Sequence, residues 1–269
     1  MQEYPELERL VGIVKKLRDP QGGCPWDLAQ THDSIKRNLV EESAEFLDAV
    51  EDRDLPEMRE ELGDLLLQVL LHSQIAQDTG EFTLEDVCRE EADKLIRRHP
   101  HVFGDRHTTD PAEALRFWNA AKRAEPGAQA QRKSVMDGVP RSMPALARCQ
   151  KALAKAGAKG FEWPDIQYVL EKTQEEFSEV KEALAEGNRA HLKEELGDLL
   201  FIVTNLCRWL DFEAEEVAHA AARKFIRRFQ MMEETARQQG KSLDDATPED
   251  WLSWWQKAKQ RKGETGKGI

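Results

Sequence analysis

The sequence predicts an all-α protein built from two tandem helical-bundle units of the same kind. Apolar residues recur at helical spacing in nearly every segment, and the strict alternation that marks a β-strand between turn signals is absent. One heptapeptide, Glu-Glu-Leu-Gly-Asp-Leu-Leu, also occurs twice without change, at residues 60–66 and 194–200. An internal repeat of this kind indicates one structural unit present twice.

Three further elements recur in the same order around the heptapeptide. An acidic cluster precedes each copy, at residues 41–45 and 175–179, with a constant offset of 175 − 41 = 134 residues. A basic stretch and then a Trp-x-x-x-Lys pair follow each copy. The basic residues are Lys94 and Arg98 in the first copy and Lys224 and Arg228 in the second, and the Trp/Lys pairs are Trp118/Lys122 and Trp255/Lys259. Four elements in one order indicate a duplication.

The expected elements of the first half are five helices, each ended by a recognisable signal. Asp54, followed by Pro56, is typical of a helix N-terminus, and Thr83 with Asp86 resembles a capping box. A loop with Gly22 and Gly23 carries the stretch Cys24-Pro25-Trp26-Asp27. The predicted helices cover about 6–18, 33–51 and 55–80, then the segment from residue 84 that Pro100 ends, and the segment after Pro111 that stops at Pro126.

Proline and glycine gather among polar residues between 126 and 144, which is typical of a linker. We therefore divide the chain of 269 residues into a first domain at 1–125, a linker at 126–143 and a second domain at 144–269, each domain long enough to bury a core. The second domain repeats the scheme, with helices expected at about 144–156, up to 186, 191–210, 214–239 and after Pro248.

Composition excludes several classes of function. The formal charge is 39 − 51 = −12, which argues against a broad surface for nucleic acid or for an anionic membrane. No apolar stretch approaches the roughly 20 residues that span a bilayer, and the acidic N-terminus is unlike a signal peptide. The four cysteines lie far apart, so neither a zinc site nor a disulfide framework is indicated. We expect a cytoplasmic protein.

The acidic residues of the repeat are expected to point into the helical bundle. An acidic helix is usually just a solvated face. Here, however, Glu42 shares its helical line with Leu39 and Phe46, and Asp64 shares one with Leu67 and Leu71. Carboxylates that converge in an interior lose hydration and repel one another, which costs several kcal/mol for each uncompensated ion. They therefore need cations.

Hard divalent cations fit this cluster best, because it offers only oxygen ligands. Two facing helices would each supply carboxylates at positions i and i+3 and hold Mg²⁺, or Mn²⁺ in its place. Mg²⁺ typically shares its shell with substrate phosphates, so the cluster points to phosphate chemistry. The predicted metal ligands are Glu42, Glu45, Glu61 and Asp64 in the first copy and Glu176, Glu179, Glu195 and Asp198 in the second.

The basic and aromatic pairs have two interpretations each. A Lys/Arg pair at i and i+4 is usually a surface salt-bridge partner, but repeated behind a metal cluster it resembles a phosphate clamp. The Trp/Lys pairs are either core tryptophans with exposed lysines or base-stacking platforms beside a phosphate ligand. Motifs for covalent catalysis are absent, so a metal-activated water is the expected nucleophile. The carboxylates considered for taking its proton are Glu175, Glu176 and Glu194.

The whole set of motifs resembles the MazG family of nucleoside triphosphate pyrophosphohydrolases, in its full-length tandem form. The matching stretches are residues 23–27, both acidic pairs in each half, and residues 97–103, 139–146 and 160–163. The resemblance implies an all-α, usually dimeric, Mg²⁺-dependent enzyme that cuts nucleoside triphosphates of broad base range into monophosphate and pyrophosphate, as nucleotide-pool housekeeping. It places the metal ligands on the two sets named above and the nucleotide contacts on Lys224, Arg228, Trp255 and Lys259, with first-copy equivalents Lys94, Arg98, Trp118 and Lys122.

In tandem members of this family the second unit is generally taken as the catalytic one. The connection from the basic pair to the tryptophan is shorter in the first copy, 118 − 94 = 24 residues against 255 − 224 = 31, and this also favours the second unit. Three other interpretations are kept open: a narrower enzyme acting on dUTP or phosphoribosyl-ATP, a nucleotide- or metal-sensing interaction module, and a structural repeat with solvated acids. A protein partner is left open as well.

Overall fold

The computed structural model describes residues 4–125 and 134–260, and within these ranges the chain forms α-helices and one 3₁₀ helix but no β-strand. The all-α prediction is confirmed. The chain divides into two compact units, Met1–Gln129 and Ala130–Ile269. Residues 126–133 of the predicted linker lie outside the described residues, and its remainder contains the 3₁₀ helix η1, Val135–Gly138.

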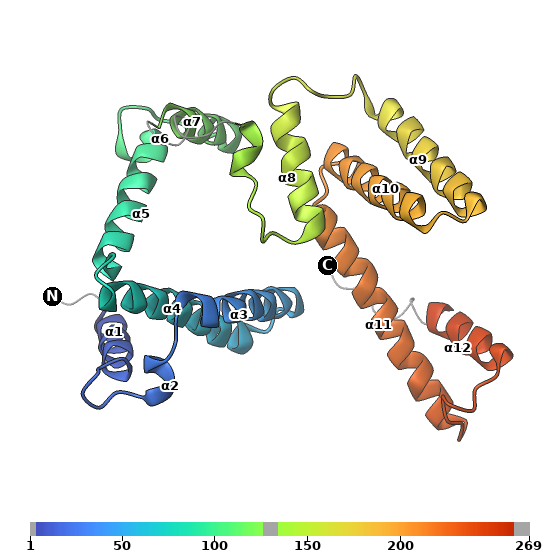
Figure 1. The fold of residues 1–269 in the computed structure, drawn as a ribbon, viewed down its shortest axis with the longest axis horizontal. Helices are drawn as coiled ribbons and strands as arrows, with labels where there is room; N and C mark the ends of the chain where they lie inside the picture. Colours follow the sequence, from blue (N-terminus) through green and yellow to red (C-terminus); the bar gives the residue numbers. More distant parts are fainter. Residues whose placement is uncertain (1–3, 126–133, 261–269) are drawn as a thin grey trace. The chain divides into compact units, whose positions relative to one another are not determined.

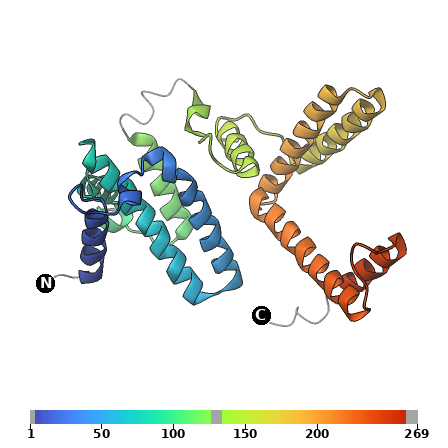
Figure 2. The same ribbon diagram turned by 60° about the horizontal axis from the view of Figure 1, so that its bottom comes forward.

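The helices of both units are drawn in Figures 1 and 2. The first unit consists of α1 (Pro5–Leu17), α2 (Pro25–Leu28), α3 (His32–Asp52), α4 (Leu55–Asp78), α5 (Leu84–Arg98), α6 (Pro100–Phe103) and α7 (Pro111–Ala124). After η1 the second unit consists of α8 (Ala145–Gly157), α9 (Ile166–Glu186), α10 (Arg189–Trp209), α11 (Ala214–Gln238) and α12 (Pro248–Gln260).

Two single-turn helices lie where the sequence predicted no helix. Pro25 begins α2 inside the expected loop, and Pro100, expected only to end a helix, begins α6 directly after α5. Proline is well suited to the first position of a helix, because its missing N–H has no partner there in any case. Pro100 therefore both limits α5 and begins α6.

Each unit is organised around an antiparallel helical hairpin, α3–α4 in the first and α9–α10 in the second (Figure 1). Both hairpins turn within two residues. Arg53 and Gly187 take a left-handed conformation at the helix ends, and Asp54 and Asn188 cap the next helix with their side-chain oxygens. These residues are related by the repeat offset, 187 − 53 = 134, so the duplication preserves the turn that aligns the two helices.

Each unit has a buried apolar cluster. The first lies between α1 and the α3–α4 hairpin, and the second lies on α11 and α12, outside the α9–α10 hairpin. In the first unit α1, α3 and α4 bury a cluster of five apolar residues, and in the second α11 and α12 bury a cluster that contains Trp254. The indole N–H of Trp254 donates a hydrogen bond of 2.9 Å to the Gln239 side chain, so its one polar atom is satisfied. The first cluster is Val14, Ile35, Leu70, Leu71 and Ile75, and the second is Met232, Ala236, Trp254 and Ala258.

One apolar face of each hairpin is unpacked in a single chain. Leu39, Leu47 and Leu66 are exposed on α3 and α4, and Phe177 and Leu200 are exposed on α9 and α10, Leu200 to 61%. Exposed apolar surface of this extent on one face is typical of an interaction site. None of the described helices is long and apolar enough to cross a membrane.

We expect Ile35→Ala to destabilise the first unit by about 2–5 kcal/mol, because Ile35 is 1% exposed and its truncation leaves a cavity against α1 and α4. The matched control is Leu55→Ala, at a position that is 72% exposed, where the change should stay within about 0.5 kcal/mol. Urea unfolding followed by circular dichroism measures both. Equal effects of the two substitutions would contradict the assigned core.

Candidate functional site

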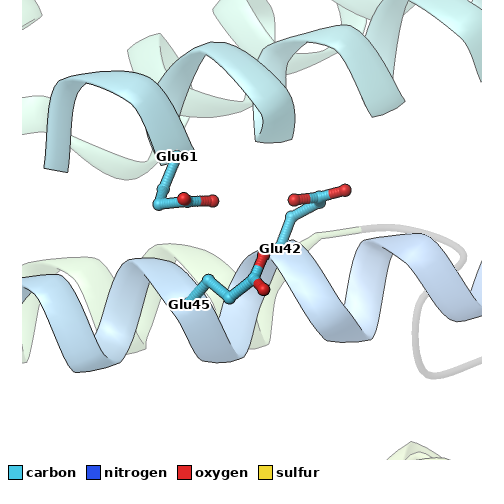
Figure 3. A group of neighbouring side chains, drawn as sticks. All are labelled: Glu42, Glu45 and Glu61. Atoms are coloured by element: carbon cyan, nitrogen blue, oxygen red, sulfur yellow. The ribbon is translucent and has the colours of Figure 1, made fainter. Parts of the chain in front are cut away.

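Three carboxylates of the first hairpin converge between its two helices. Figure 3 shows Glu42 and Glu45 on α3 pointing toward Glu61 on α4. One oxygen from each of the three lies within 4.8 Å of the others. We call Glu42, Glu45 and Glu61 the first triad.

The first triad contains a strained electrostatic arrangement. Burial, followed by the charges of Asp64 and Glu45, raises the pKa of Glu42 above its ordinary value. Burial, followed by the charges of Glu45 and Asp64, likewise raises the pKa of Glu61. Glu61 is only 7% exposed, and among the described residues its Oε2 has no hydrogen-bond partner. Buried carboxylates without donors are costly, so this site suits a cation.

The second hairpin holds a matching group, Glu176 and Glu179 on α9 with Glu195 on α10, again with oxygens within 4.8 Å of one another. We call these three residues the second triad. Both triads offer oxygen ligands alone, which fits Mg²⁺ or Mn²⁺ and not a soft metal. In each unit, three of the four carboxylates predicted to converge from two facing helices lie together.

The ammonium group of Lys172 and the imidazole of His191 lie against the second triad. The Nζ atom of Lys172 is 3.0 Å from Glu176 Oε1 and 2.8 Å from Glu175 Oε1. His191 Nε2 is 3.0 Å from Glu195 Oε1. Hydrogen bonds to Glu175 and Glu176 raise the pKa of Lys172, and the hydrogen bond to Glu186 raises the pKa of His191. The second triad is thus partly neutralised by its own chain.

Sequence reasoning missed Lys172 and His191, although a signal was available. Each lies four residues before a triad member, Glu176 and Glu195 respectively, and residues at i and i+4 are neighbours on a helix. Burial raises the pKa of Glu179, an effect that the charge of Lys172 opposes.

The remaining predicted acids lie around the triads. Asp64 is close enough to raise the pKa of Glu42 and of Glu61 but is not a member of the first triad. Asp198 is exposed and outside the second triad. Glu175 and Glu194 are exposed, and Glu175 is held by Lys172. As metal ligands or catalytic groups, Asp64, Asp198, Glu175 and Glu194 stay predictions.

The basic and aromatic residues of the second unit form one surface on α11 and α12. The guanidinium carbon of Arg228 lies 5.5 Å from the centre of the Trp255 ring, and Lys259 Nζ lies 5.9 Å from it. Exposed Lys224 is on the same helix as Arg228. An apolar hollow of about 480 Å³ adjoins Trp255, and its lining comprises Phe225, Phe229, Met232, Pro248, Trp251, Leu252 and Trp255.

The corresponding residues of the first unit are already paired. The Arg98 guanidinium donates two hydrogen bonds, of 2.9 and 2.6 Å, to the Glu125 carboxylate, and both side chains are mostly buried. This pairing raises the pKa of Arg98. Lys94 forms an ion pair with Glu91. Lys94 and Arg98 are therefore neutralised within the first unit, whereas no carboxylate of the described residues forms an ion pair with Arg228.

The shorter connection in the first unit still brings Trp118 against Arg98. The guanidinium carbon lies 5.3 Å from the Trp118 ring, and the His99 ring packs edge-on at 4.7 Å. Lys122 is exposed and, among the described cations, is not the one that contacts this ring. That the shorter connection keeps Trp118 from closing on a nucleobase stays a prediction.

Within the described residues, no hydrogen bond or ion pair joins either triad to Lys94, Arg98, Lys224 or Arg228. The triads lie on the hairpins, whereas the basic residues belong to α5 and α11.

A family model described as the MazG nucleotide pyrophosphohydrolase domain matches residues 30–103 and again residues 165–232. A Thermotoga maritima protein named nucleoside triphosphate pyrophosphohydrolase/pyrophosphatase MazG is 42% identical over 253 residues, which cover 94% of this chain and 95% of that protein. An Escherichia coli K12 protein named nucleoside triphosphate pyrophosphohydrolase is 40% identical over 96% of this chain and 98% of its own length. A crystal structure of a mazG-related protein from Thermotoga maritima covers 43% of this chain and 98% of that chain, at 30% identity and a TM-score of 0.38.

We expect the free energy of unfolding of the metal-free protein to depend on pH through the first triad. A carboxyl whose pKa is raised by folding binds more protons in the native state than in the unfolded chain. Its contribution to stability therefore falls as the pH rises from its ordinary value of 4.5 toward the raised value. Glu61→Gln should flatten this fall. Urea unfolding at a series of pH values in EDTA measures it, and parallel curves for parent and variant would contradict the electrostatic assignment.

Proposed function

This chain belongs to the MazG family of nucleotide pyrophosphohydrolases, and we propose that its second unit cleaves nucleoside triphosphates to monophosphate and pyrophosphate with a divalent metal ion. The chain is a nucleoside triphosphate pyrophosphohydrolase by that membership. What we propose beyond it is the metal dependence, the unit that acts, the residues and the substrate range.

The observation that carries the proposal is the second triad. Glu176, Glu179 and Glu195 bring three carboxylates together with oxygen ligands only, and Asp198 lies one helical turn beyond Glu195. A divalent ion held there would polarise the phosphoryl oxygens and lower the pKa of the attacking water. Mg²⁺ is the ion that best fits a site shared with substrate phosphates, and Mn²⁺ has the same ligand preference.

Glu194 is our proposed acceptor for the proton of that water. It neighbours Glu195 in the chain and is exposed. Of the other two candidates, Glu176 belongs to the triad and Glu175 is held by Lys172 at 2.8 Å. A general base has to be free to accept a proton, and this condition favours Glu194 over both.

The second unit is favoured over the first by its basic surface. Arg228 and Lys259 lie against Trp255, and on our proposal they bind phosphate oxygens while a nucleobase stacks on the ring. The equivalent Arg98 is held by Glu125. A phosphate would have to displace a bidentate, mostly buried carboxylate to reach it, which is costly.

A broad base range follows from stacking. An aromatic face accepts every base, because stacking does not depend on the hydrogen-bonding edge. We therefore propose that ribo- and deoxyribonucleotides of all bases are substrates and that the role is nucleotide-pool housekeeping. The described cysteines are free thiols, which suits a reducing cytoplasm.

We further propose that the active form is a homodimer. The apolar faces of both hairpins are exposed in one chain, and packing them against a second copy would bury them. A second copy could also bring basic residues of α5 or α11 toward the triads.

Glu195→Ala should lower pyrophosphate release from nucleoside triphosphates by roughly 100-fold or more, because it removes a metal ligand. Glu61→Ala, the same change at the matching position of the first unit, should leave it within about twofold. Release of pyrophosphate and of orthophosphate is measured in parallel with each nucleotide and Mg²⁺. Orthophosphate without pyrophosphate would refute the reaction, and equal losses in both variants would refute the choice of unit.

Phe177→Asp should shift the protein toward monomer, since a buried interface carboxylate without a partner is strongly unfavourable. Leu115→Asp, at an equally exposed apolar position on α7, is the control and should leave the assembly unchanged. Sedimentation velocity at several protein concentrations distinguishes the two. A parent protein that sediments as a monomer throughout would argue against the proposed dimer.

A further inference from the structure

We propose that the two triads differ in cation affinity: the first binds a divalent cation without nucleotide, whereas Lys172 neutralises the second and weakens nucleotide-free binding there. Lys172 would thus be the residue that sets metal affinity in the second unit. The inference rests on the proposed role of the triads as metal sites.

Among residues 4–125 and 134–260, no cationic side chain forms an ion pair with the first triad. The groups that act on Glu61 are carboxylates, namely Glu45, Asp64, Glu57 and Glu42. Glu61 is more than nine-tenths buried, its side chain points toward Glu42 and Glu45 (Figure 3), and its Oε2 has no hydrogen-bond partner in the described part of the chain. A divalent ion would relieve the repulsion among these carboxylates and coordinate the unpartnered oxygen. Both effects favour its binding at the first triad.

The second triad already forms an ion pair with an ammonium group. Lys172 Nζ is 3.0 Å from Glu176 Oε1, and Glu176 is the buried member, 8% exposed. On α10, His191 Nε2 lies 3.0 Å from the accepting Oε1 of Glu195. A metal ion at this triad must either displace the ammonium or sit beside a like charge, and both weaken its binding.

The repeat itself supplies the comparison. At the offset of 134 residues, Lys172 corresponds to Asn38 (172 − 134 = 38) and His191 corresponds to Glu57 (191 − 134 = 57). The ligands are unchanged between the copies, but a cation becomes a neutral amide and an imidazole becomes a carboxylate. The two units therefore differ in the charge around the triad and not in the triad.

This difference suits a division of labour. A second triad that binds metal weakly alone gains affinity when nucleotide phosphates arrive, because their negative charge attracts the metal and competes for Lys172. The first triad needs no such help and lies in a unit whose Arg98 is already paired with Glu125. The first unit would then carry a resident ion, and the second would load its ion together with substrate.

The test is a nucleotide-free titration of the full-length protein with Mn²⁺, with free Mn²⁺ measured by electron paramagnetic resonance. We expect one tight equivalent per chain, and Glu61→Gln should abolish it. Lys172→Asn should tighten the weaker site by about tenfold, and Asn38→Lys should weaken the tight site by about as much, the effect expected for one nearby unit charge. The control is Lys181→Asn, which removes the same charge from the same helix where Lys181 lies over the Phe177 ring.

The outcomes separate the inference from the function that it rests on. Two equivalents of equal affinity in the parent, or no response to either exchange while pyrophosphate release is normal, would overturn the inference alone. Mn²⁺ bound at neither triad would overturn the proposed metal role as well. The two substitutions lie in different units. If circular dichroism shows that Lys172→Asn does not fold, Asn38→Lys still tests whether a lysine beside a triad weakens Mn²⁺ binding.

Discussion

Repulsion between converging carboxylates is the constraint on which the rest of this structure depends. Three acids can be held within 4.8 Å only if both helices of a hairpin are fixed in register. The two-residue turns fix them: a left-handed residue ends one helix, and a capping Asp54 or Asn188 starts the next. The apolar cluster of α1, α3 and α4 anchors the first hairpin away from the acids. Local turn chemistry and a distant core together hold charges that oppose folding.

The two units meet this constraint in different ways. The second supplies Lys172 and His191, which lie within hydrogen-bonding distance of Glu176 and Glu195. The first supplies no cation to its triad among the described residues and leaves Glu61 with an unpartnered oxygen. The opposite holds for the basic residues, since Arg98 is paired with Glu125 whereas Arg228 lies on Trp255. Among the described residues, the first unit thus pairs its arginine and leaves its triad without a cation, whereas the second unit pairs its triad and leaves Arg228 without a carboxylate partner.

Much of this could be predicted from the sequence, because it depends on short spacings. The helices, the caps at Asp54 and Thr83, and the convergence of acids from two helices follow from periodicity and capping patterns. The pair Arg98–Glu125 could not be predicted, because it joins residues 27 apart on different elements. Nor could Asp198 be ranked below Glu195, since both fit the same helical line and only packing separates a half-buried acid from an exposed one.

The identical heptapeptides also show why a shared motif does not imply a shared activity. Residues 60–66 and 194–200 carry the same acids, so any difference in chemistry has to come from neighbours outside the motif. At close range a single unit charge changes an equilibrium by about tenfold or more. The exchange of Asn38 for Lys172 across the repeat is such a change, and so is the presence of Glu125 at Arg98. On the proposals made above, the triads stayed constant after the duplication while the surrounding charges gave each unit its own part in binding metal and nucleotide.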